Sequence, residues 1–224
     1  MSTTSHYPGQ IGNAETVQQL QNAGVIGQID GDFPSDEILE IGDALLASPI
    51  FAIAVVHANS QTLKAIAALR ERGGEHMLVG ASNICTTLDV SMVADAGAQF
   101  IVSPYFDYAA STRAQVLAIP YLPGIFVRDE AEEALAAGRA LQHLFPVDIL
   151  GPSHIVELRT ALPDCKFIPS SGVHLHNITA HAQAGAAAVI VDCGPEPGAP
   201  WTQAEIITYV RSLRRVWEQA KALE

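Results

Sequence analysis

Charged residues, basic residues above all, are scarce in this chain of 224 residues. Only 16% of the residues are charged, and 12 Lys and Arg stand against 24 Asp and Glu, which gives a formal net charge of −12. Nucleic acids and anionic membrane surfaces repel a protein of that sign, and the densest basic group is only Arg211, Arg214 and Arg215. The sequence therefore predicts neither a nucleic-acid partner nor a membrane partner.

Long apolar runs and paired cysteines are also lacking. The longest purely apolar run, from residue 50 to residue 56, is far shorter than the roughly 20 residues that span a membrane. The first nine residues have neither the charged nor the apolar region of a secretion signal. The three cysteines, Cys85, Cys165 and Cys193, are widely spaced and form no Cys-x-x-Cys pair. We therefore expect reduced thiols and a cytoplasmic protein.

Short apolar runs, each followed by a helical pattern, recur along the whole chain. Eight of them have the length of a strand and are continuous rather than alternating, which is typical of parallel strands buried on both faces. Eight strand–helix units in a chain of this length predict a single-domain (β/α)₈ barrel over residues 1–224. The expected strands cover residues 25–29, 50–56, 77–79, 99–103, 119–122, 142–145, 167–169 and 187–191.

The remaining segments are assigned to helices and to the two ends of the chain. Residues 1–13 are expected to be flexible, and residues 201–224 to form a closing helix, from Gln203 to Leu223. Further helices are predicted over residues 36–47, 61–72, 87–96 and 174–184, with Ser35 and Ser60 as N-caps. An Ala-Gly pair precedes three of the strands, as expected where a left-handed residue ends a helix.

The most specific local signal is a pair of loops built from small residues. Ser170, Ser171 and Gly172 follow the seventh expected strand, and Cys193 and Gly194 follow the eighth. Barrels of this class frequently bind phosphate between these two loops, where backbone N–H groups face the anion. These five residues are our candidate phosphate site, and an ordinary strand-to-helix turn is the structural alternative.

Over nearly the whole barrel, from about Val17 to Cys193, the chain resembles the 2-keto-3-deoxy-6-phosphogluconate (KDPG) and 4-hydroxy-2-oxoglutarate (KHG) aldolases. The segments that carry the resemblance are Val79-Gly-Ala-Ser-Asn-Ile84, Asp95-Ala-Gly-Ala-Gln-Phe-Ile-Val-Ser-Pro104, Ile119-Pro-Tyr-Leu-Pro-Gly-Ile125, Phe145-Pro146 and Pro169-Ser-Ser-Gly-Val173. The resemblance implies a class I aldolase-like barrel, a small anionic substrate and a homo-oligomer, most simply a trimer.

The resemblance also shows which functional positions have changed. The family's Schiff-base lysine, two residues before Phe-Pro, corresponds to His143, and imidazole cannot form an iminium. The family's acid/base glutamate, its carboxylate-binding arginine and its threonine on the third strand correspond to Ala54, Ala58 and Asn83. The resemblance thus implies an aldolase scaffold with an altered catalytic set.

His143 and Asn83 are the candidate catalytic residues: the resemblance places His143 at the centre of the family's site and Asn83 at the position of the family's threonine. His143 is either a general acid/base or a hydrogen-bonded structural residue. Asn59, Ser103, Pro104 and Phe145 are the candidate substrate-binding residues. No short-spaced ligand motif supports a metal site from His143, Asp192 and Asp30, so we expect neither a metal nor another cofactor.

Three functions remain open. The first is an aldolase-type lyase acting on a small 2-oxo acid, phosphorylated or not. The second is an isomerase or epimerase of a phosphosugar that uses His143 and Asn83 without a covalent intermediate. The third is a catalytically inactive barrel that binds a phosphosugar.

Overall fold

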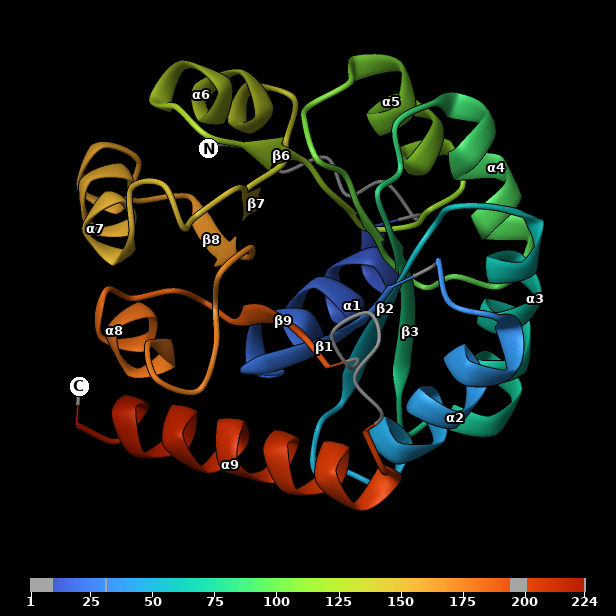
Figure 1. The fold of residues 1–224 in the computed structure, drawn as a ribbon. Helices are drawn as coiled ribbons and strands as arrows, with labels where there is room; N and C mark the ends of the chain where they lie inside the picture. Colours follow the sequence, from blue (N-terminus) through green and yellow to red (C-terminus); the bar gives the residue numbers. More distant parts are fainter. Residues whose placement is uncertain (1–9, 31, 194–200, 224) are drawn as a thin grey trace.

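Parallel strands alternate with helices in the computed structural model, which describes residues 10–30, 32–193 and 201–223 (Figure 1). The strands are β1 (Val25–Ile29), β2 (Ala52–Val56), β3 (Leu78–Ser82), β4 (Ile101–Val102), β5 (Tyr121–Leu122), β6 (Gly124–Ile125), β7 (Leu141–Leu144), β8 (Lys166–Pro169) and β9 (Val189–Asp192). The helices are α1 (Gln10–Asn22), α2 (Ser35–Leu46), α3 (Ser60–Gly73), α4 (Thr87–Asp95), α5 (Tyr108–Val116), α6 (Arg128–Ala136), α7 (Pro152–Ala161), α8 (Ile178–Gln183) and α9 (Gln203–Lys221).

The strands form two parallel sheets in the described part of the chain. One sheet has the order β5-β4-β3-β2-β1-β9 and the other has the order β6-β7-β8. Pro123, which has no N–H to donate, separates β5 from β6, and the strand changes its pairing partner from β4 to β7 at that point. The structure thus confirms the predicted parallel strands. In place of the single closed barrel sheet that the sequence predicts, it has two separate sheets.

Alternation along each strand divides the buried apolar side chains into two layers. An inner core lies between the sheets, and an outer core lies between the sheets and the surrounding helices. The inner core contains Leu20, Ala23, Ile26, Ala52, Ala54, Phe100, Val102, Leu122, Leu141, Ile168, Ala188 and Ile190. Residues two positions apart on a strand face the same side of the sheet. A polar residue two positions beyond one of these inner-core residues therefore also faces the interior.

Helix α1 closes the amino end of the strands. Leu20 and Ala23 at its end are buried in the inner core, and Val17 packs against it. In Figure 1 this helix crosses behind the strands, while α2 to α8 lie around the outside. The predicted flexible segment is therefore helical from Gln10 onward, and residues 1–9 lie outside the described part of the chain.

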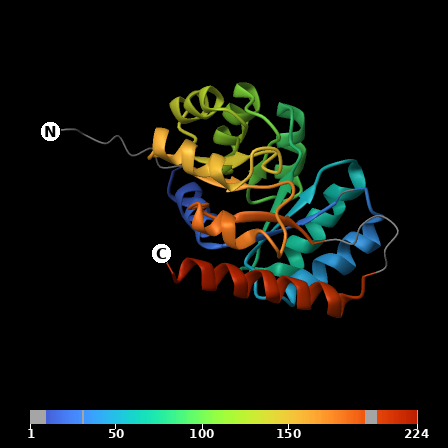
Figure 2. The same ribbon diagram turned by 60° about the vertical axis from the view of Figure 1, so that its left-hand side comes forward.

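Near the end of the chain, helix α9 lies where the closing helix is expected. Helix α9 runs along one edge of the molecule beside α8 and α2 (Figures 1 and 2). Its buried face, with Leu213 and Trp217, belongs to the outer core. No helix in the described residues is both long enough and apolar enough to span a bilayer.

Helix beginnings differ from the sequence-based expectations in three helices, α2, α3 and α8. The residues at the N-cap positions are Pro34 and Asn59, one before each expected serine, and the Asn59 side chain accepts a hydrogen bond from the Gln61 amide at 2.8 Å. Helix α8 begins at Ile178 rather than near His174, because Asn177 holds the preceding turn through the His174 amide and the Gly172 carbonyl. The expected helix N-terminus beside Gly172 is therefore wrong.

Candidate functional site

A buried histidine–serine pair lies at the carboxyl end of neighbouring strands. His143 on β7 and Ser170, directly after β8, follow the inner-core residues Leu141 and Ile168 by two positions and face the interior. The His143 Nε2 atom lies 2.5 Å from the Ser170 hydroxyl oxygen. Each residue is only 5% exposed. The structure thus brings together one residue of the predicted catalytic set and one of the predicted phosphate set.

The second ring nitrogen fixes the protonation of the pair. His143 Nδ1 lies 2.9 Å from the Ser103 carbonyl oxygen, which can only accept a hydrogen bond. In the neutral ring, Nδ1 therefore carries the proton, and Nε2 accepts the hydrogen bond that Ser170 donates. Burial lowers the pKa of His143 to about 4, although the Ser103 carbonyl acts in the opposite direction. The imidazole is therefore neutral at pH 7 and presents a lone pair to Ser170.

A second polar group faces the same interior from β1, β3 and β9. The Ser82 hydroxyl donates to Gln28 Oε1 at 3.1 Å, and Gln28 Nε2 donates to Asp192 Oδ1 at 2.7 Å. Asp192 is exposed and Gln28 is half-buried, so this chain of hydrogen bonds leads from the interior to solvent. Sequence reasoning missed Gln28, although a lone polar residue within the apolar run 25–29 was a usable signal.

Of the four predicted substrate-binding residues, two contact the ring of His143 and the other two do not. Ser103 contributes its carbonyl, while its hydroxyl donates to the Tyr105 carbonyl at 2.7 Å. Phe145 stacks on the imidazole with ring centroids 5.3 Å apart. Pro104 is half-buried, and its backbone carbonyl faces Gly124 closely. Asn59 is an exposed helix N-cap, so its side chain is engaged away from the pair.

Asn83 is placed at the rim rather than on the inner face. It follows Ser82 by one position, has a φ of 62°, and is exposed. Its side-chain amide donates to the His57 carbonyl at 3.3 Å. Ser82 takes the inward position at the end of β3, and a catalytic role for Asn83 stays a prediction.

The loop after β8 presents backbone donors, whereas the described part of the loop after β9 does not. Among the described residues, no hydrogen bond uses the amides of Ser171 and Gly172, whose φ angles are 67° and 76°. The Ser170 amide donates to the Leu144 carbonyl, and the Cys193 amide donates to the Gln28 carbonyl. Two of the five predicted phosphate-binding residues therefore offer free amides, and Gly194 lies outside the described residues.

The Cys193 thiol points away from the inner face. It is fully buried in the outer core, and its Sγ atom contacts the Val191 carbonyl at 3.3 Å. Burial first, and then the nearby charge of Asp192, raise the pKa of this thiol to about 12. The protonated thiol at this position is a packing residue and offers an anion no charge.

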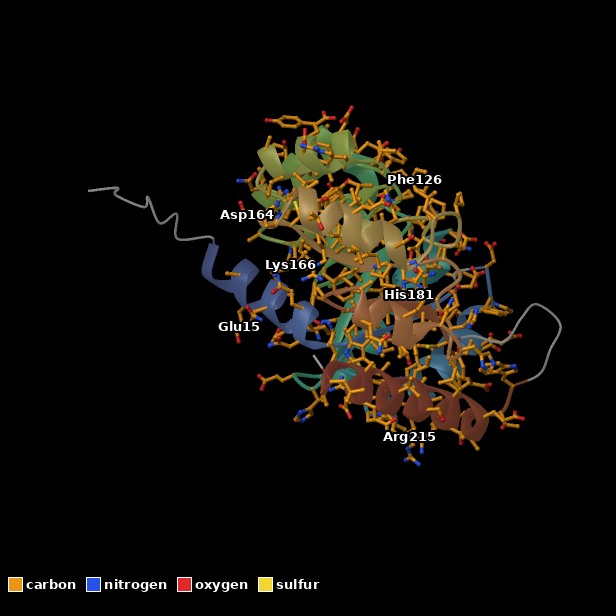
Figure 3. All side chains as sticks on the ribbon, turned by 90° about the vertical axis from the view of Figure 1, so that its left-hand side faces the viewer. Glu15, Phe126, Asp164, Lys166, His181 and Arg215 are labelled. Carbon is orange, nitrogen blue, oxygen red and sulfur yellow. The ribbon has the colours of Figure 1, made fainter. Side chains whose placement is uncertain are left out.

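The three lysines of the sequence lie away from the carboxyl ends of the strands. Lys166 is the exposed first residue of β8, and in Figure 3 it appears at the same end of the molecule as Glu15 of α1. Lys64 is exposed on α3. The Lys221 amine, on α9, donates to the Ala182 carbonyl at 3.1 Å. None of these amines reaches the inner face beside His143.

The described residues contain no group of three His, Cys, Asp or Glu side chains arranged to hold a metal ion. His174 and His176 have ring centroids 5.8 Å apart, but no third ligand joins them there.

Comparison with known proteins identifies the same family along most of the chain. The family model described as KDPG and KHG aldolase matches residues 17–196. A 2-dehydro-3-deoxy-phosphogluconate aldolase from Treponema pallidum is 29% identical over 64% of this chain and 68% of its own length. A probable 2-dehydro-3-deoxy-6-phosphogalactonate aldolase from Rhizobium meliloti is 36% identical over 48% of this chain, and the match spans only about half, 51%, of that relative.

A solved structure shows the same fold. The KDPG aldolase from Legionella pneumophila, with pyruvate captured at low pH as a covalent carbinolamine intermediate, has a TM-score of 0.73 and is 24% identical over 98% of both chains. At this identity the comparison supports the arrangement of strands and helices.

Proposed function

Because the chain belongs to the KDPG and KHG aldolase family, we propose that it acts on a small 2-oxo acid, phosphorylated or not, as a carbon–carbon lyase without a covalent intermediate. The observation that carries this proposal is a neutral, interior His143 in a chain whose three lysines all lie elsewhere. The captured carbinolamine in the Legionella protein needs an amine. We propose that His143 takes the place of the lysine that supplies such an amine in the family.

The proposed reaction is a retro-aldol cleavage driven by proton transfer. The base, His143 Nε2, takes the proton of the substrate hydroxyl, directly or through the Ser170 hydroxyl. The carbon–carbon bond then breaks, and its electron pair moves onto the carbonyl of the 2-oxo acid to form an enolate. The same proton returns from His143 to the enolate carbon, so that aldehyde and pyruvate-type product leave.

Backbone donors would stabilise the enolate in place of an iminium. The free amides of Ser171 and Gly172 are the donors available at this end of the strands, because the Ser82 hydroxyl already donates to Gln28 Oε1. The same two amides form the proposed phosphate or carboxylate site. No Lys or Arg among the described residues joins them, which predicts weaker anion binding than a cationic site would give.

Two further features belong to the proposal. We propose that the two parallel sheets together make one eight-position barrel, with β5 and β6 as a single strand position interrupted at Pro123. We also propose a homo-oligomer, a trimer, and exposed apolar side chains such as Leu88, Tyr108 and Ile149 support a buried interface. We propose, finally, that the protein is cytoplasmic.

The experiment follows proton exchange and adduct formation with the same substrate. Pyruvate is incubated with the protein in D₂O, and loss of its methyl proton signal is followed by nuclear magnetic resonance. We expect exchange that is lost in the His143→Gln variant, and no adduct by intact mass after borohydride treatment. An adduct on Lys64 or Lys166 would overturn the non-covalent mechanism. A His143→Lys/Ala54→Glu variant that gains the adduct would support the family alignment.

The alternatives give different results in the same assays. An isomerase or epimerase would exchange the α-proton of a phosphosugar without producing pyruvate. An inactive barrel would bind a phosphosugar without exchanging any proton, and either outcome would replace the lyase proposal.

A further inference from the structure

The pair of Ser170 and His143 has the geometry of an activated hydroxyl nucleophile. A serine becomes nucleophilic when a base accepts its proton and a third group orients that base. Here Nε2 lies 2.5 Å from the Ser170 hydroxyl oxygen, and the Ser103 carbonyl orients the ring through Nδ1 at 2.9 Å. A nucleophile directly after β8, a base on β7 and an orienting carbonyl at the end of β4 thus lie within hydrogen-bonding distance of one another in that order.

The surroundings restrict the imidazole to that orientation. Phe145 lies against one face of the ring, with an interplanar angle of 26°. His143 and Ser170 are each 5% exposed, so bulk water scarcely competes for the hydrogen bond between them. The base is therefore held with its lone pair toward a single hydroxyl.

Donors for a developing oxyanion lie directly after the nucleophile. Ser171 and Gly172 both have positive φ angles, which turn the chain sharply at the end of β8. No described residue accepts a hydrogen bond from either amide. In enzymes that use a serine at a strand end, the amide of the next residue supplies one half of the oxyanion site.

We propose that Ser170 is an acyl-accepting nucleophile, with His143 as its base, and that this site hydrolyses esters of small acids. The Ser170 oxygen attacks the ester carbonyl while its proton passes to His143 Nε2, and the carbon–alkoxide bond breaks as the alkoxide takes that proton. A water molecule then gives one proton to Nε2 and attacks the acyl carbon. Ser170 leaves with the proton from Nε2, and a carboxylic acid is released.

This activity is separate from carbon–carbon cleavage. A carbonyl in place of the usual carboxylate leaves the imidazolium less stabilised in acylation and deacylation alike, so we expect slow turnover, with an acyl-enzyme that accumulates only when the leaving group is a good one, as in 4-nitrophenyl acetate. Because Ser170 is nearly buried, the substrate's acyl group must be small.

The test is covalent labelling with a small reagent, methanesulfonyl fluoride, followed by intact mass and peptide mapping. We expect one adduct per chain, on Ser170, together with a burst of 4-nitrophenol from 4-nitrophenyl acetate. Ser170→Ala should lose both signals. His143→Gln should lose at least nine tenths of the labelling rate, because Gln Oε1 can accept the Ser170 hydrogen bond but cannot act as a base.

Ser153→Ala is the matched control, since Ser153 is an exposed serine that bonds the Leu150 carbonyl, and it should be labelled like the wild type. Thermal melting of each variant verifies that it is folded. An unlabelled wild type beside a labelled serine hydrolase in the same tube would refute the proposal, as would an adduct that persists in Ser170→Ala. Neither result depends on whether pyruvate protons exchange.

Discussion

Lowering the pH from 7.5 to 5.0 should destabilise this protein through its buried histidines. Burial lowers the pKa of His143 from the ordinary 6.5 to about 4. Burial, followed by the nearby His174, lowers the pKa of His181 to about 4 as well. Between these two values the unfolded chain binds protons that the folded chain does not, so the free energy of unfolding falls as the pH falls through this window.

The magnitude follows from the two pKa values. At pH 5.0, an unfolded pKa of 6.5 and a folded pKa of about 4 give a loss of about 2 kcal/mol for each histidine. The two residues together give about 4 kcal/mol, a large part of the 5–15 kcal/mol by which domains are typically stable. Above pH 7.5 the contribution is constant, because both states are then neutral at these rings.

Urea unfolding at fixed protein concentration, followed through the fluorescence of Trp201 and Trp217, measures this loss. Between pH 7.5 and 5.0, the free energy of unfolding of His143→Gln should fall by about 2 kcal/mol less than that of the wild type, whatever its value at pH 7.5. His181→Gln should behave in the same way. His76→Gln, at an exposed position, is the control and should parallel the wild type. Parallel pH dependences for wild type and His143→Gln would refute the reasoning.

Two further predictions concern packing and assembly. A Cβ atom at Gly124 would lie 2.1 Å from the Pro104 carbonyl carbon, so Gly124→Ala should lower the free energy of unfolding by about 3 kcal/mol in urea titrations. At the control position Gly138, an added Cβ meets nothing within 4 Å, so Gly138→Ala should lower the free energy of unfolding by about 1 kcal/mol, from its positive φ alone. Equal losses in the two variants would contradict the packing argument. Light scattering at micromolar concentration should give about three times the chain mass of 23.8 kDa, and a monomer mass would contradict the trimer.

The order and direction of the strands could be predicted from sequence because each strand is a continuous apolar run. Every expected strand overlaps an observed one, and the pairing is parallel throughout the described residues. Boundaries were less accurate where loop residues continue the ladder: β3 reaches Ser82 rather than ending at Val79. The interruption at Pro123 depends on which neighbours the strand pairs with, and an apolar run does not encode that choice.

Site residues could be predicted from the sequence only where their position in a strand determines where the side chain lies. His143 lies on the inner face of β7, where the family resemblance places it, and Lys166 lies at the amino end of β8, as its position in the apolar run indicates. Gln28 and Asp192 meet across 164 residues, and no local pattern links them. Asn59 illustrates the opposite difficulty, since a polar residue after a strand fits a helix cap as well as a substrate contact.

A structural and a catalytic His143 are separable because its two hydrogen bonds have different requirements. A structural histidine needs only an acceptor facing Ser170 and a donor facing Ser103, and glutamine can supply the first of these. Catalysis needs a group that binds and releases a proton at the position of Nε2, which glutamine cannot do. If His143→Gln stays folded and labelling of Ser170 or exchange of pyruvate protons disappears, the imidazole acts as a base. If both signals are absent from the wild type while the pH dependence of unfolding follows His143, the ring is a buried support for the ends of β4 and β8.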